Sequence, residues 1–252
     1  HGGGGEDRRP VKAVKICGIV ALQGEAINMI IAHASDLHGS YKLLGGLPQL
    51  PDVWAITGDF FPTLGRSSFT NFTIDPAVER DHQSKWWHFK GPSIIRRLGG
   101  KPVLWVGGNH DYLSLPRMLK LSGYAGAAHD VSLGPVEIDG QRFAGFRQVP
   151  YIMGEWNGEV YRADLPGIVE QMMAHDPTVL LTHAPPCGIL DDDGGEGHGC
   201  GIEALTTWLA YRPHRITHHL FGHIHQQGGK RTEEMGITFV NSATCVQLVE
   251  VV

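Results

Sequence analysis

Residues that bind metal ions or transfer protons gather at a few points of this sequence, each directly after an apolar run. The most compact case is VGGNHDY, in which Asn109, His110 and Asp111 follow two glycines. Three adjacent polar residues can form an ordinary turn. Imidazole, carboxylate and amide groups are also the side chains that coordinate metals and act as acids or bases. The rest of the chain favours the second interpretation.

Other apolar runs are followed by the same kinds of residue. These residues are Asp36 and His38, then Asp59, then His183, and finally His223 and His225. Any one of them alone most often belongs to a turn or loop, and a single Asp-x-His or His-x-His pair is weak evidence for a metal site. Together they indicate a shared site, because open α/β sheets bind ligands at the C-terminal ends of their strands. Glycines before Asp59, Asn109 and His223 allow sharp turns and close backbone approach.

These side chains outnumber the ligands of a single metal ion. The candidate ligands are Asp36, His38, Asp59, His183, His223 and His225, together with members of the Asn109-His110-Asp111 group. One zinc ion usually takes about four ligands, so the set divides naturally between two metal ions that share a carboxylate. Carboxylate, imidazole and amide groups together suit manganese, iron or zinc better than a metal that selects thiolates. Two such ions can share a hydroxide and hold a phosphoryl oxygen.

The elements that must position these residues alternate between apolar β-type runs and helix-like stretches. Expected strands cover residues 29–35, 53–58, 102–108, 178–183, 218–223, 236–243 and 246–252. Residues 136–146 read as a hairpin with Asp139 and Gly140 in the turn. This order predicts a layered α/β fold in which two sheets pack together and helices lie outside.

The helices are predicted from capping residues and from periodicity. Asp75 and Pro76 open the first helix as its N-cap and first residue. Gly91-Pro92 is expected to end this helix, and a second helix then continues to Gly99. Residues 165–175 and 201–212 have the periodicity of amphipathic helices.

The N-terminus differs in composition from the rest of the chain. It begins HGGGGEDRRP, with four consecutive glycines and no initiator Met. We predict that residues 1–28 are a flexible extension, either added to the natural chain or an unprocessed leader. Residues 29–252 are then one domain. The alternative is that residues 11–22 add an edge strand to this domain.

Composition excludes several classes of function. The formal net charge of −5 argues against a general nucleic-acid-binding surface. No apolar run approaches the roughly 18 residues of a membrane span. Four widely spaced cysteines without a CxxC pair are typical of free thiols in a reducing compartment, so we predict a cytoplasmic protein.

The order of the motifs resembles that of the calcineurin-like metallophosphoesterases. The matching motifs are Asp36-x-His38, Gly58-Asp59, Gly108-Asn109-His110-Asp111, His183 and Gly222-His223-x-His225. The loops LTHAPPCGILDDDGGEGHGC, FGHIHQQGG and FVNSATC are similar to the metallophosphoesterase-domain-containing subgroup, whose characterised members look like class III phosphodiesterases. The resemblance implies a four-layer α/β/β/α sandwich of two mixed β-sheets flanked by helices.

The resemblance also implies a role for each residue. Asp36, His38 and His225 would hold the first metal ion, and Asn109, His183 and His223 the second. Asp59 would bridge the two ions. His110 would stay off the metals and protonate the leaving group, a task that suits a histidine pKa of about 6.5.

The implied activity is that of a dinuclear metal-dependent phosphoesterase that attacks phosphorus with a metal-bridging hydroxide. Two divalent or trivalent ions are expected, with Mn²⁺ favoured and iron or zinc as alternatives. A phosphodiesterase acting on small diesters or cyclic nucleotides is favoured by the subgroup resemblance. A phosphomonoesterase, including a protein phosphatase, is the alternative enzyme. A non-catalytic scaffold is disfavoured, because every expected ligand is present.

Several residues have two open interpretations. Asp111 either orients an imidazole or is a carboxylate in a surface turn. His198, in the polar 187–200 loop, is read as solvated rather than as part of a gate. A zinc site of Cys187, Cys200 and His198 is disfavoured, because the spacing matches no usual ligand pair.

Two interpretations concern surfaces. Arg147 is read as a surface arginine, with contact to a phosphate oxygen as the alternative. Trp86 and Trp87 either pack inside the fold or form an association surface, in which case the chain is a homo-oligomer.

Overall fold

The computed structural model of this chain describes residues 28–64, 74–195 and 200–252. The predicted extension lies outside these residues except for Asn28, so its nature and the domain boundary at residue 29 stay predictions. None of the described helices combines the length and the apolar character that a membrane-spanning helix needs.

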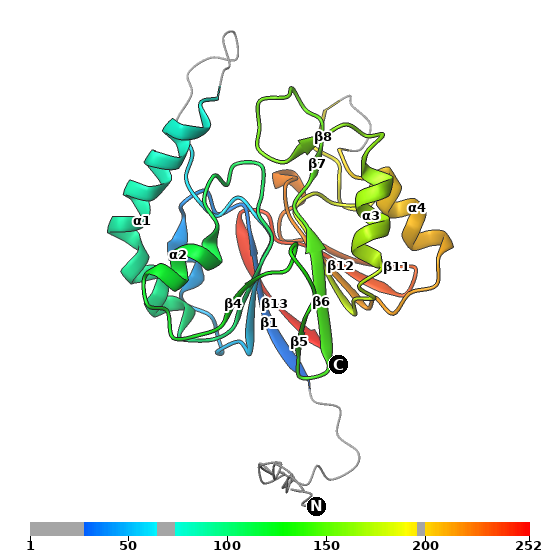
Figure 1. The fold of residues 1–252 in the computed structure, drawn as a ribbon. Helices are drawn as coiled ribbons and strands as arrows, with labels where there is room; N and C mark the ends of the chain where they lie inside the picture. Colours follow the sequence, from blue (N-terminus) through cyan, green and yellow to red (C-terminus); the bar gives the residue numbers. More distant parts are fainter. Residues whose placement is uncertain (1–27, 65–73, 196–199) are drawn as a thin grey trace, which may run out of the picture.

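Two mixed sheets form the centre of the molecule (Figure 1). The first has the order β13-β1-β2-β3-β4, in which β13 is antiparallel to β1 and the other pairs are parallel. Its strands are β1 (Met29–Ser35), β2 (Val53–Ile56), β3 (Val103–Trp105), β4 (Ala128–Asp130) and β13 (Cys245–Val251).

The second sheet has the order β11-β12-β10-β9-β6-β5, with antiparallel pairs only at its two edges. Its strands are β5 (Val136–Ile138), β6 (Gln141–Phe146), β9 (Val179–Thr182), β10 (His218–Phe221), β11 (Arg231–Glu234) and β12 (Ile237–Asn241). A separate parallel pair, β7 (Val149–Pro150) and β8 (Glu159–Val160), lies beyond the sheet edge at the top of Figure 1.

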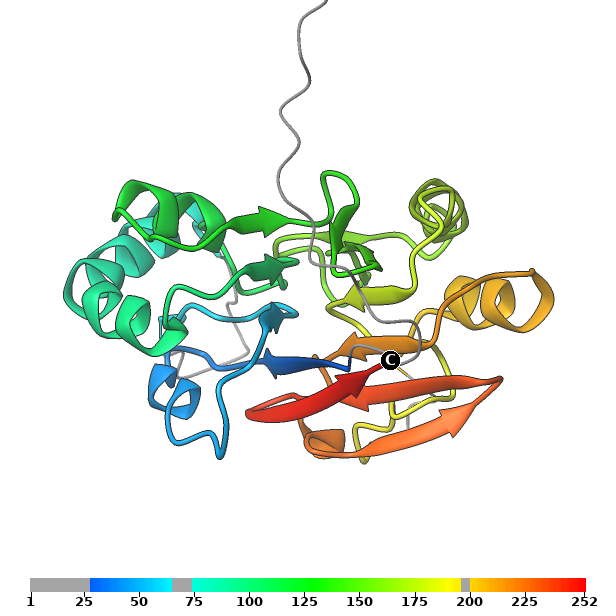
Figure 2. The ribbon, with the colours of Figure 1, turned by 90° about the horizontal axis from the view of Figure 1, so that it is seen from below.

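Helices cover the outer face of each sheet. On one side are α1 (Pro76–Leu98) and α2 (Leu115–Leu121), and on the other α3 (Leu165–Met173) and α4 (Glu203–Tyr211), as Figure 2 shows. Short 3-10 helices, η1 (Tyr41–Leu44) and η3 (His225–Gln227), lie in loops. The buried apolar residues form three clusters, one between the sheets and one beneath each helical layer. The predicted α/β/β/α sandwich is therefore confirmed.

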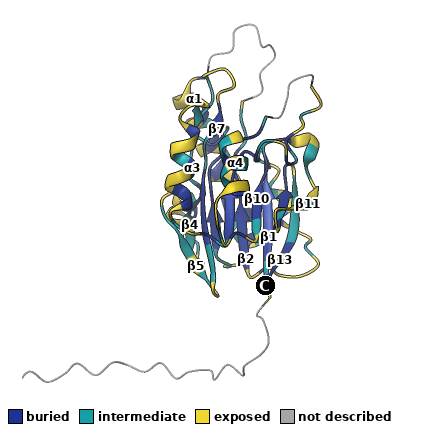
Figure 3. Cartoon of the chain, turned by 90° about the vertical axis from the view of Figure 1, so that its right-hand side faces the viewer, coloured by how far each residue is buried: buried dark blue, intermediate teal, exposed yellow. Residues whose placement is uncertain are grey.

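Burial follows from strand alternation. Along β1, Ile31 faces the layer between the sheets, while Ala32 and Ala34 face the layer beneath α1. The central strands are accordingly buried on both faces (Figure 3), as expected for parallel strands covered on both sides. Such strands read as continuous apolar runs, which is why the sequence revealed them.

The hairpin prediction is confirmed. β5 and β6 are antiparallel, and the turn residues Asp139 and Gly140 have φ angles of 47° and 83°. Both lie in the left-handed region that a two-residue hairpin turn requires. Strands β4, β7, β8 and β11 were not predicted, because they are short or, in β11, carry the charged sequence RTEE of an edge strand.

The predicted break at Gly91-Pro92 is wrong. Helix α1 runs unbroken through Pro92 and ends at Leu98, with Gly99 as its C-cap at a φ of 63°. Asp75 is the N-cap, as predicted, and accepts hydrogen bonds from two backbone amides of the first turn. Proline inside a helix costs about 3 kcal/mol. Packing of buried residues on both sides of the proline, Trp87 and Ile94, outweighs that cost.

Candidate metal centre

Residues from strand ends of both sheets meet in one cluster. In the group predicted for the first metal ion, His225 Nε2 lies 3.2 Å from Asp36 Oδ1 and 3.4 Å from His38 Nε2. The ligand atoms of these three residues lie within 4.8 Å of one another. Two imidazole nitrogens that face each other beside a carboxylate leave a space that suits a cation. The structure thus brings together the three residues predicted for the first metal.

The second group gathers around His183. His183 Nε2 lies 3.0 Å from Asn109 Oδ1 and 3.4 Å from Asp59 Oδ2. The rings of His183 and His223 have centroids 4.9 Å apart. Asp59 Oδ2 is also 3.8 Å from His38 Nε2, so this carboxylate lies between the two groups.

The backbone at these positions is strained. Asp36, His38, Asp59 and His223 all have positive φ angles, of 53°, 42°, 50° and 69°. Such angles are uncommon in residues with a Cβ and cost of order 1–3 kcal/mol each. They persist here because hydrogen bonds hold them, including those from the Asp36 amide to Gly58 O and from the His223 amide to Asp36 Oδ2. Strain of this kind at four converging residues indicates a functional site.

Two glycines let the strand ends approach this closely. A Cβ on Gly108 would overlap the Asp59 carboxylate, and a Cβ on Gly222 would overlap Asp36 Oδ2 and the Ser35 hydroxyl. Both positions therefore exclude any side chain. The close approach expected next to Asn109 and His223 is confirmed.

Electrostatics make the cluster attractive to cations. Burial alone would raise the pKa of Asp59, but the charge of neighbouring His183 holds it well below the usual range. Burial opposes protonation of His183, yet Asp59 raises the pKa of that imidazole to about 9. Burial lowers the pKa of His223 to about 4, which keeps its ring neutral and able to bind a metal.

His110 lies beside the two groups. Its Nε2 is 3.8 Å from Asp59 Oδ2, its ring centroid is 5.0 Å from that of His38, and its Nδ1 is buried without a hydrogen-bond partner among the described residues. Burial lowers its pKa. The Trp156 ring covers the imidazole with centroids 4.0 Å apart. Sequence reasoning missed Trp156, because the loop that carries it has no periodic pattern.

Hydroxyl groups and carbonyls behind the cluster orient its members. Ser35 donates from Oγ to Asp36 Oδ2 at 2.6 Å, with Thr57 O as a further acceptor at 3.0 Å. Thr57 O also accepts from His183 Nδ1 at 2.7 Å, which directs Nε2 of that ring into the site. His33 supports Thr57 in turn, with Nε2 2.9 Å from its hydroxyl. In the sequence, the hydroxyl residues are marked by their positions: Ser35 stands directly before Asp36, and Thr57 stands directly before Gly58-Asp59.

Both interpretations of Asp111 are replaced by a third. Its side chain is buried and accepts hydrogen bonds from the amides of Gly108 and Phe61, at 2.9 and 3.1 Å. Burial, followed by the negative charge of Asp59, raises its pKa to about 6. Asp111 therefore closes the loop that carries Asn109 and neither lies at the surface nor bonds to an imidazole.

Arg147 was predicted to be a surface residue, and this is wrong. It is partly buried and its Nη2 donates to the carbonyls of Gly108 and Asp111, at 3.3 and 3.5 Å. Gln83 of α1 holds the same loop from the other side, donating to His110 O at 2.7 Å. Carbonyl acceptors give no sequence signal, so these contacts could not be foreseen.

The remaining open interpretations concern thiols, tryptophans and one loop. His198 lies outside the described residues. Cys200 donates to Asp193 at 3.3 Å, and among the described residues the metal-type clusters contain no cysteine. Trp87 is buried and Trp86 packs against Phe60 and Phe61, so packing is the interpretation that the structure favours for both rings.

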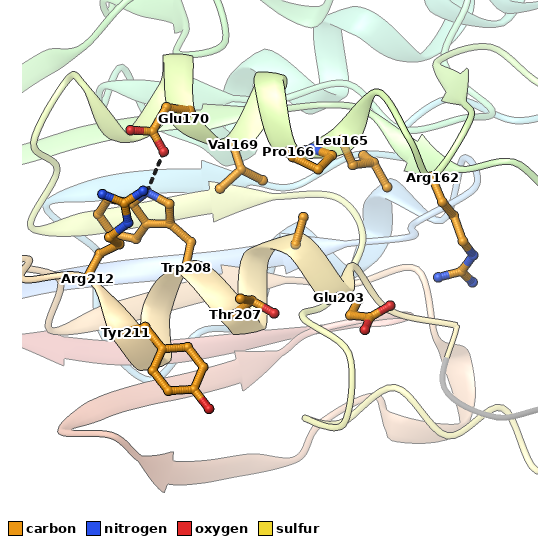
Figure 4. Close-up of a pocket in the computed structure, with 11 residues that line it drawn as sticks. Arg162, Leu165, Pro166, Val169, Glu170, Glu203, Thr207, Trp208, Tyr211 and Arg212 are labelled. Carbon is orange, nitrogen blue, oxygen red and sulfur yellow. Dashed lines mark hydrogen bonds between the residues drawn. The ribbon is translucent and has the colours of Figure 1, made fainter.

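A cavity of about 490 Å³ opens onto the cluster. Its lining combines Asp59, Asn109, His110, His223 and His225 with residues of the β7–β8 loop and with Arg162. A second groove of about 420 Å³ lies between α3 and α4 (Figure 4) and also reaches Arg162. The second groove contains none of the clustered residues, so the chemistry belongs to the first.

Comparisons with known proteins place this arrangement in a family. A model of the calcineurin-like phosphoesterase family matches residues 29–227. The chain is 41% identical over 71 residues to UPF0046 protein K07C11.7 of Caenorhabditis elegans, which is 28% of this chain and 23% of that protein. TT1561 of Thermus thermophilus is similar in structure over 88% of this chain and 98% of that chain, with a TM-score of 0.53 and 14% identity. This likeness concerns the fold alone, and the chain matches less than a quarter of the length of the nematode relative.

Proposed function

Because this chain belongs to the calcineurin-like phosphoesterase family, we propose that it hydrolyses phosphodiesters with the help of two bound metal ions. The observation that carries the proposal is the environment of His183. Its Nδ1 is held by Thr57 O, and its Nε2 faces Asn109 Oδ1 and Asp59 Oδ2 at 3.0 and 3.4 Å. Without metal, the pKa of about 9 places a proton on Nε2 between the ring and these two oxygens, and a bound metal ion would take the place of that proton.

The donor set fits a pair of ions. Asp36, His38 and His225 would hold one ion, since their ligand atoms already lie within 4.8 Å of one another. Asn109, His183 and His223 would hold the other. Asp59 would bridge, because its Oδ2 lies near both His38 and His183. Oxygen and imidazole ligands favour Mn²⁺, with iron and zinc as alternatives.

Bound ions of this kind supply an activated water and positive charge for the phosphoryl oxygens. The chain would contribute the proton for the leaving group from His110, whose pKa is lowered by burial, so that the protonated ring is a stronger acid than free histidine but a smaller fraction at neutral pH. His110 is positioned for that role by the hydrogen bond from its backbone amide to Asp59 Oδ1 at 2.7 Å and by the ring of Trp156. Once its Nε2 has protonated the departing alkoxide, solvent reprotonates the imidazole.

Diesters are favoured over monoesters on two grounds. The loop sequences around His183 and His223 resemble those of phosphodiesterase-like relatives. The cavity of about 490 Å³ also leaves room for ester groups on both sides of a phosphate. The proposed substrate is then a small diester, such as a cyclic nucleotide. We further propose that the protein is cytoplasmic and that its cysteines are reduced. A phosphomonoesterase or protein phosphatase is the second candidate, because the same ligands serve both reactions.

Metal content and a substrate screen test this proposal together. After loading with Mn²⁺ and gel filtration, the protein should retain about two ions per chain. It should hydrolyse bis-p-nitrophenyl phosphate and cyclic nucleotides faster than p-nitrophenyl phosphate. Asp59→Asn should lose both properties, and Asp176→Asn, which changes an exposed aspartate paired with Arg215, should keep them. Failure to bind metal would refute the site. Hydrolysis of monoesters alone would favour the second candidate, and bound metal without any hydrolysis would favour a scaffold.

A further inference from the structure

The side chain of His110 lacks the hydrogen bond that usually orients an imidazole in a reactive site. Its backbone is held, since the amide donates to Asp59 Oδ1 at 2.7 Å and the carbonyl accepts from Gln83 Nε2 at 2.7 Å. The ring nitrogen Nδ1, however, is buried without a hydrogen-bond partner among the described residues. In most functional histidines a hydrogen bond at one ring nitrogen fixes the direction of the other. The direction of Nε2 must therefore be set by contacts of the ring itself.

Trp156, from the loop between β7 and β8, supplies the closest of these ring contacts. Its indole lies on the imidazole of His110 with ring centroids 4.0 Å apart and an interplanar angle of 47°. The other ring contact, with the edge of His38, has centroids 5.0 Å apart. Because packed groups leave little free space, the imidazole cannot turn far unless the indole moves. The position of His110 Nε2 thus depends on the position of Trp156.

A single carboxylate holds the backbone of this loop. Glu159, the first residue of β8, accepts hydrogen bonds at Oε2 from the amides of Ile152, Met153 and Gly154, and at Oε1 from the amide of Trp156. The distances range from 2.6 to 3.1 Å. Hydrogen bonds from amides to a carboxylate are stronger than those between neutral groups. Glu159 therefore fixes the part of the loop from which the indole projects.

Asn157 joins the loop to the backbone on both sides of His110. Its amide donates to Asn109 O at 3.2 Å, and its Nδ2 donates to Asp111 O at 2.6 Å. These two carbonyls belong to the residues directly before and after His110. The loop and the segment that carries His110 are therefore one hydrogen-bonded unit, in which the indole is laid against the imidazole.

We propose that Glu159 is a positioning residue for His110. By ordering the β7–β8 loop, its carboxylate holds Trp156 against the imidazole and so sets the direction in which Nε2 gives its proton to the leaving group. Glu159 does not line the cavity, so it acts through the indole and not on the substrate. The inference rests on the proposed function, in which His110 is the proton donor. A displacement of about 1 Å in such a group can lower the rate by up to about 10²-fold.

Two diesters that differ only in the leaving group test this role in the Mn²⁺-loaded protein. Methyl p-nitrophenyl phosphate releases a weakly basic nitrophenolate, whereas methyl phenyl phosphate releases a more basic phenolate that depends more on a proton donor. Glu159→Gln keeps the size of the side chain, but its amide nitrogen only donates, so part of the loop loses its acceptor. In this variant kcat for methyl phenyl phosphate should fall about tenfold, and kcat for methyl p-nitrophenyl phosphate less than about twofold. The KM values and the metal content should stay unchanged.

The NMR signals of the His110 ring report its position without turnover and without metal. In the metal-free protein the ring current of Trp156 shifts the carbon-bound protons of this imidazole, because the two rings are in contact. His110→Gln assigns the signals, and Trp156→Leu gives their unshifted position. Glu159→Gln should move the signals towards that position, which a loss of stability alone would not do in the folded protein. Glu233→Gln, the same change at an exposed residue of β11, is the control and should leave signals and rates unchanged.

The outcomes separate this inference from the proposed function. Equal losses of kcat for the two diesters in Glu159→Gln, or His110 signals that keep their wild-type position, would overturn the inference and leave the phosphodiesterase proposal standing. Trp156→Leu removes the indole but leaves Glu159 in place and should show the same selective loss, so equal losses in that variant would also overturn the inference. A wild type that hydrolyses no diester would refute the proposed reaction, and the NMR signals would then decide alone whether Glu159 sets the position of the imidazole.

Discussion

The buried imidazole of His219 should make the folded protein less stable in acid, and His219→Phe should remove that effect. His219 is fully buried on β10 against Phe221 and Phe239, with Thr182 Oγ1 2.7 Å from its Nε2. Burial lowers its pKa from 6.5 to about 3. Below pH 6.5 the unfolded chain therefore binds a proton at this residue that the folded chain does not bind. The stability that neutral His219 contributes is lost progressively as the pH falls from 6.5 towards 3.

The size of the effect follows from the two pKa values. Between pH 7 and pH 5 a folded-state pKa of about 3 costs about 2 kcal/mol in the free energy of unfolding. His33 also lowers the free energy of unfolding as the pH falls, because burial lowers its pKa to about 3. Asp111 has the opposite effect on the free energy of unfolding. Its pKa is raised to about 6, so as the pH falls the folded chain binds a proton at this residue before the unfolded chain does. Both residues are present in the wild type and in the variant, so the difference between the two proteins isolates His219.

Urea unfolding of the metal-free protein at pH 7 and pH 5, followed by tryptophan fluorescence, measures the effect. The variant should lose about 2 kcal/mol less than the wild type between the two pH values. Any packing cost of phenylalanine is the same at both pH values and cancels. Phe239→Leu is the control, since it alters packing beside His219 without removing an imidazole and should lower stability equally at both. An unchanged pH dependence in His219→Phe would show that the ring is not held neutral.

Four further predictions concern the metal centre. Asp59→Asn should weaken the binding of both ions by at least tenfold in a metal titration, because one carboxylate lies between the two groups; loss of a single ion would contradict the bridge. His110→Ala should retain both ions but lose about 10²–10⁴ in rate, most for alkoxide leaving groups; equal losses for alkoxide and nitrophenolate groups would argue against proton donation. The apparent affinity for Mn²⁺ should rise by up to about tenfold per pH unit from pH 7 to 9, because metal binding displaces the proton from His183. Asp59 raises the pKa of that imidazole to about 9 against the effect of burial. An affinity that stays constant with pH in calorimetric titrations would refute this prediction. Gly108→Ala should abolish metal binding in elemental analysis, because its Cβ overlaps the Asp59 carboxylate, whereas Gly167→Ala, with open space around its Cβ, should bind metal normally.

Much of the fold could be predicted because its central strands are buried on both faces. The apolar runs of β1 and β9 and the turn residues Asp139 and Gly140 carry local signals. Helix α1 was predicted with a break, because the local preference of Gly91-Pro92 points to one and only packing on the sheet opposes it. Short strands such as β7 and β8 depend on pairing between distant segments, which leaves no pattern in either segment.

The clustering of the candidate site could be predicted for the same reason. The strand ends before Asp36 and Asp59 meet because parallel neighbouring strands place their carboxyl ends at one edge of a sheet. His183 follows a strand of the other sheet, so packing of the two sheets brings it to Asp59. The supporting contacts could not be predicted. Asp111 and Arg147 act through backbone amides and carbonyls, which every residue has and which therefore mark no position in a sequence.

By itself, the amino-acid sequence determined which residue types stand at the strand ends and in what order, because burial and turn chemistry are local. Tertiary structure decided which face each side chain occupies and how far apart the groups lie. Only there does Trp156 lie on His110, Thr57 O orient His183, and Glu159 order the loop beside the cavity. These contacts join residues far apart in the chain or depend on one loop conformation, so they exist only once the two sheets have packed and the loops have closed over them.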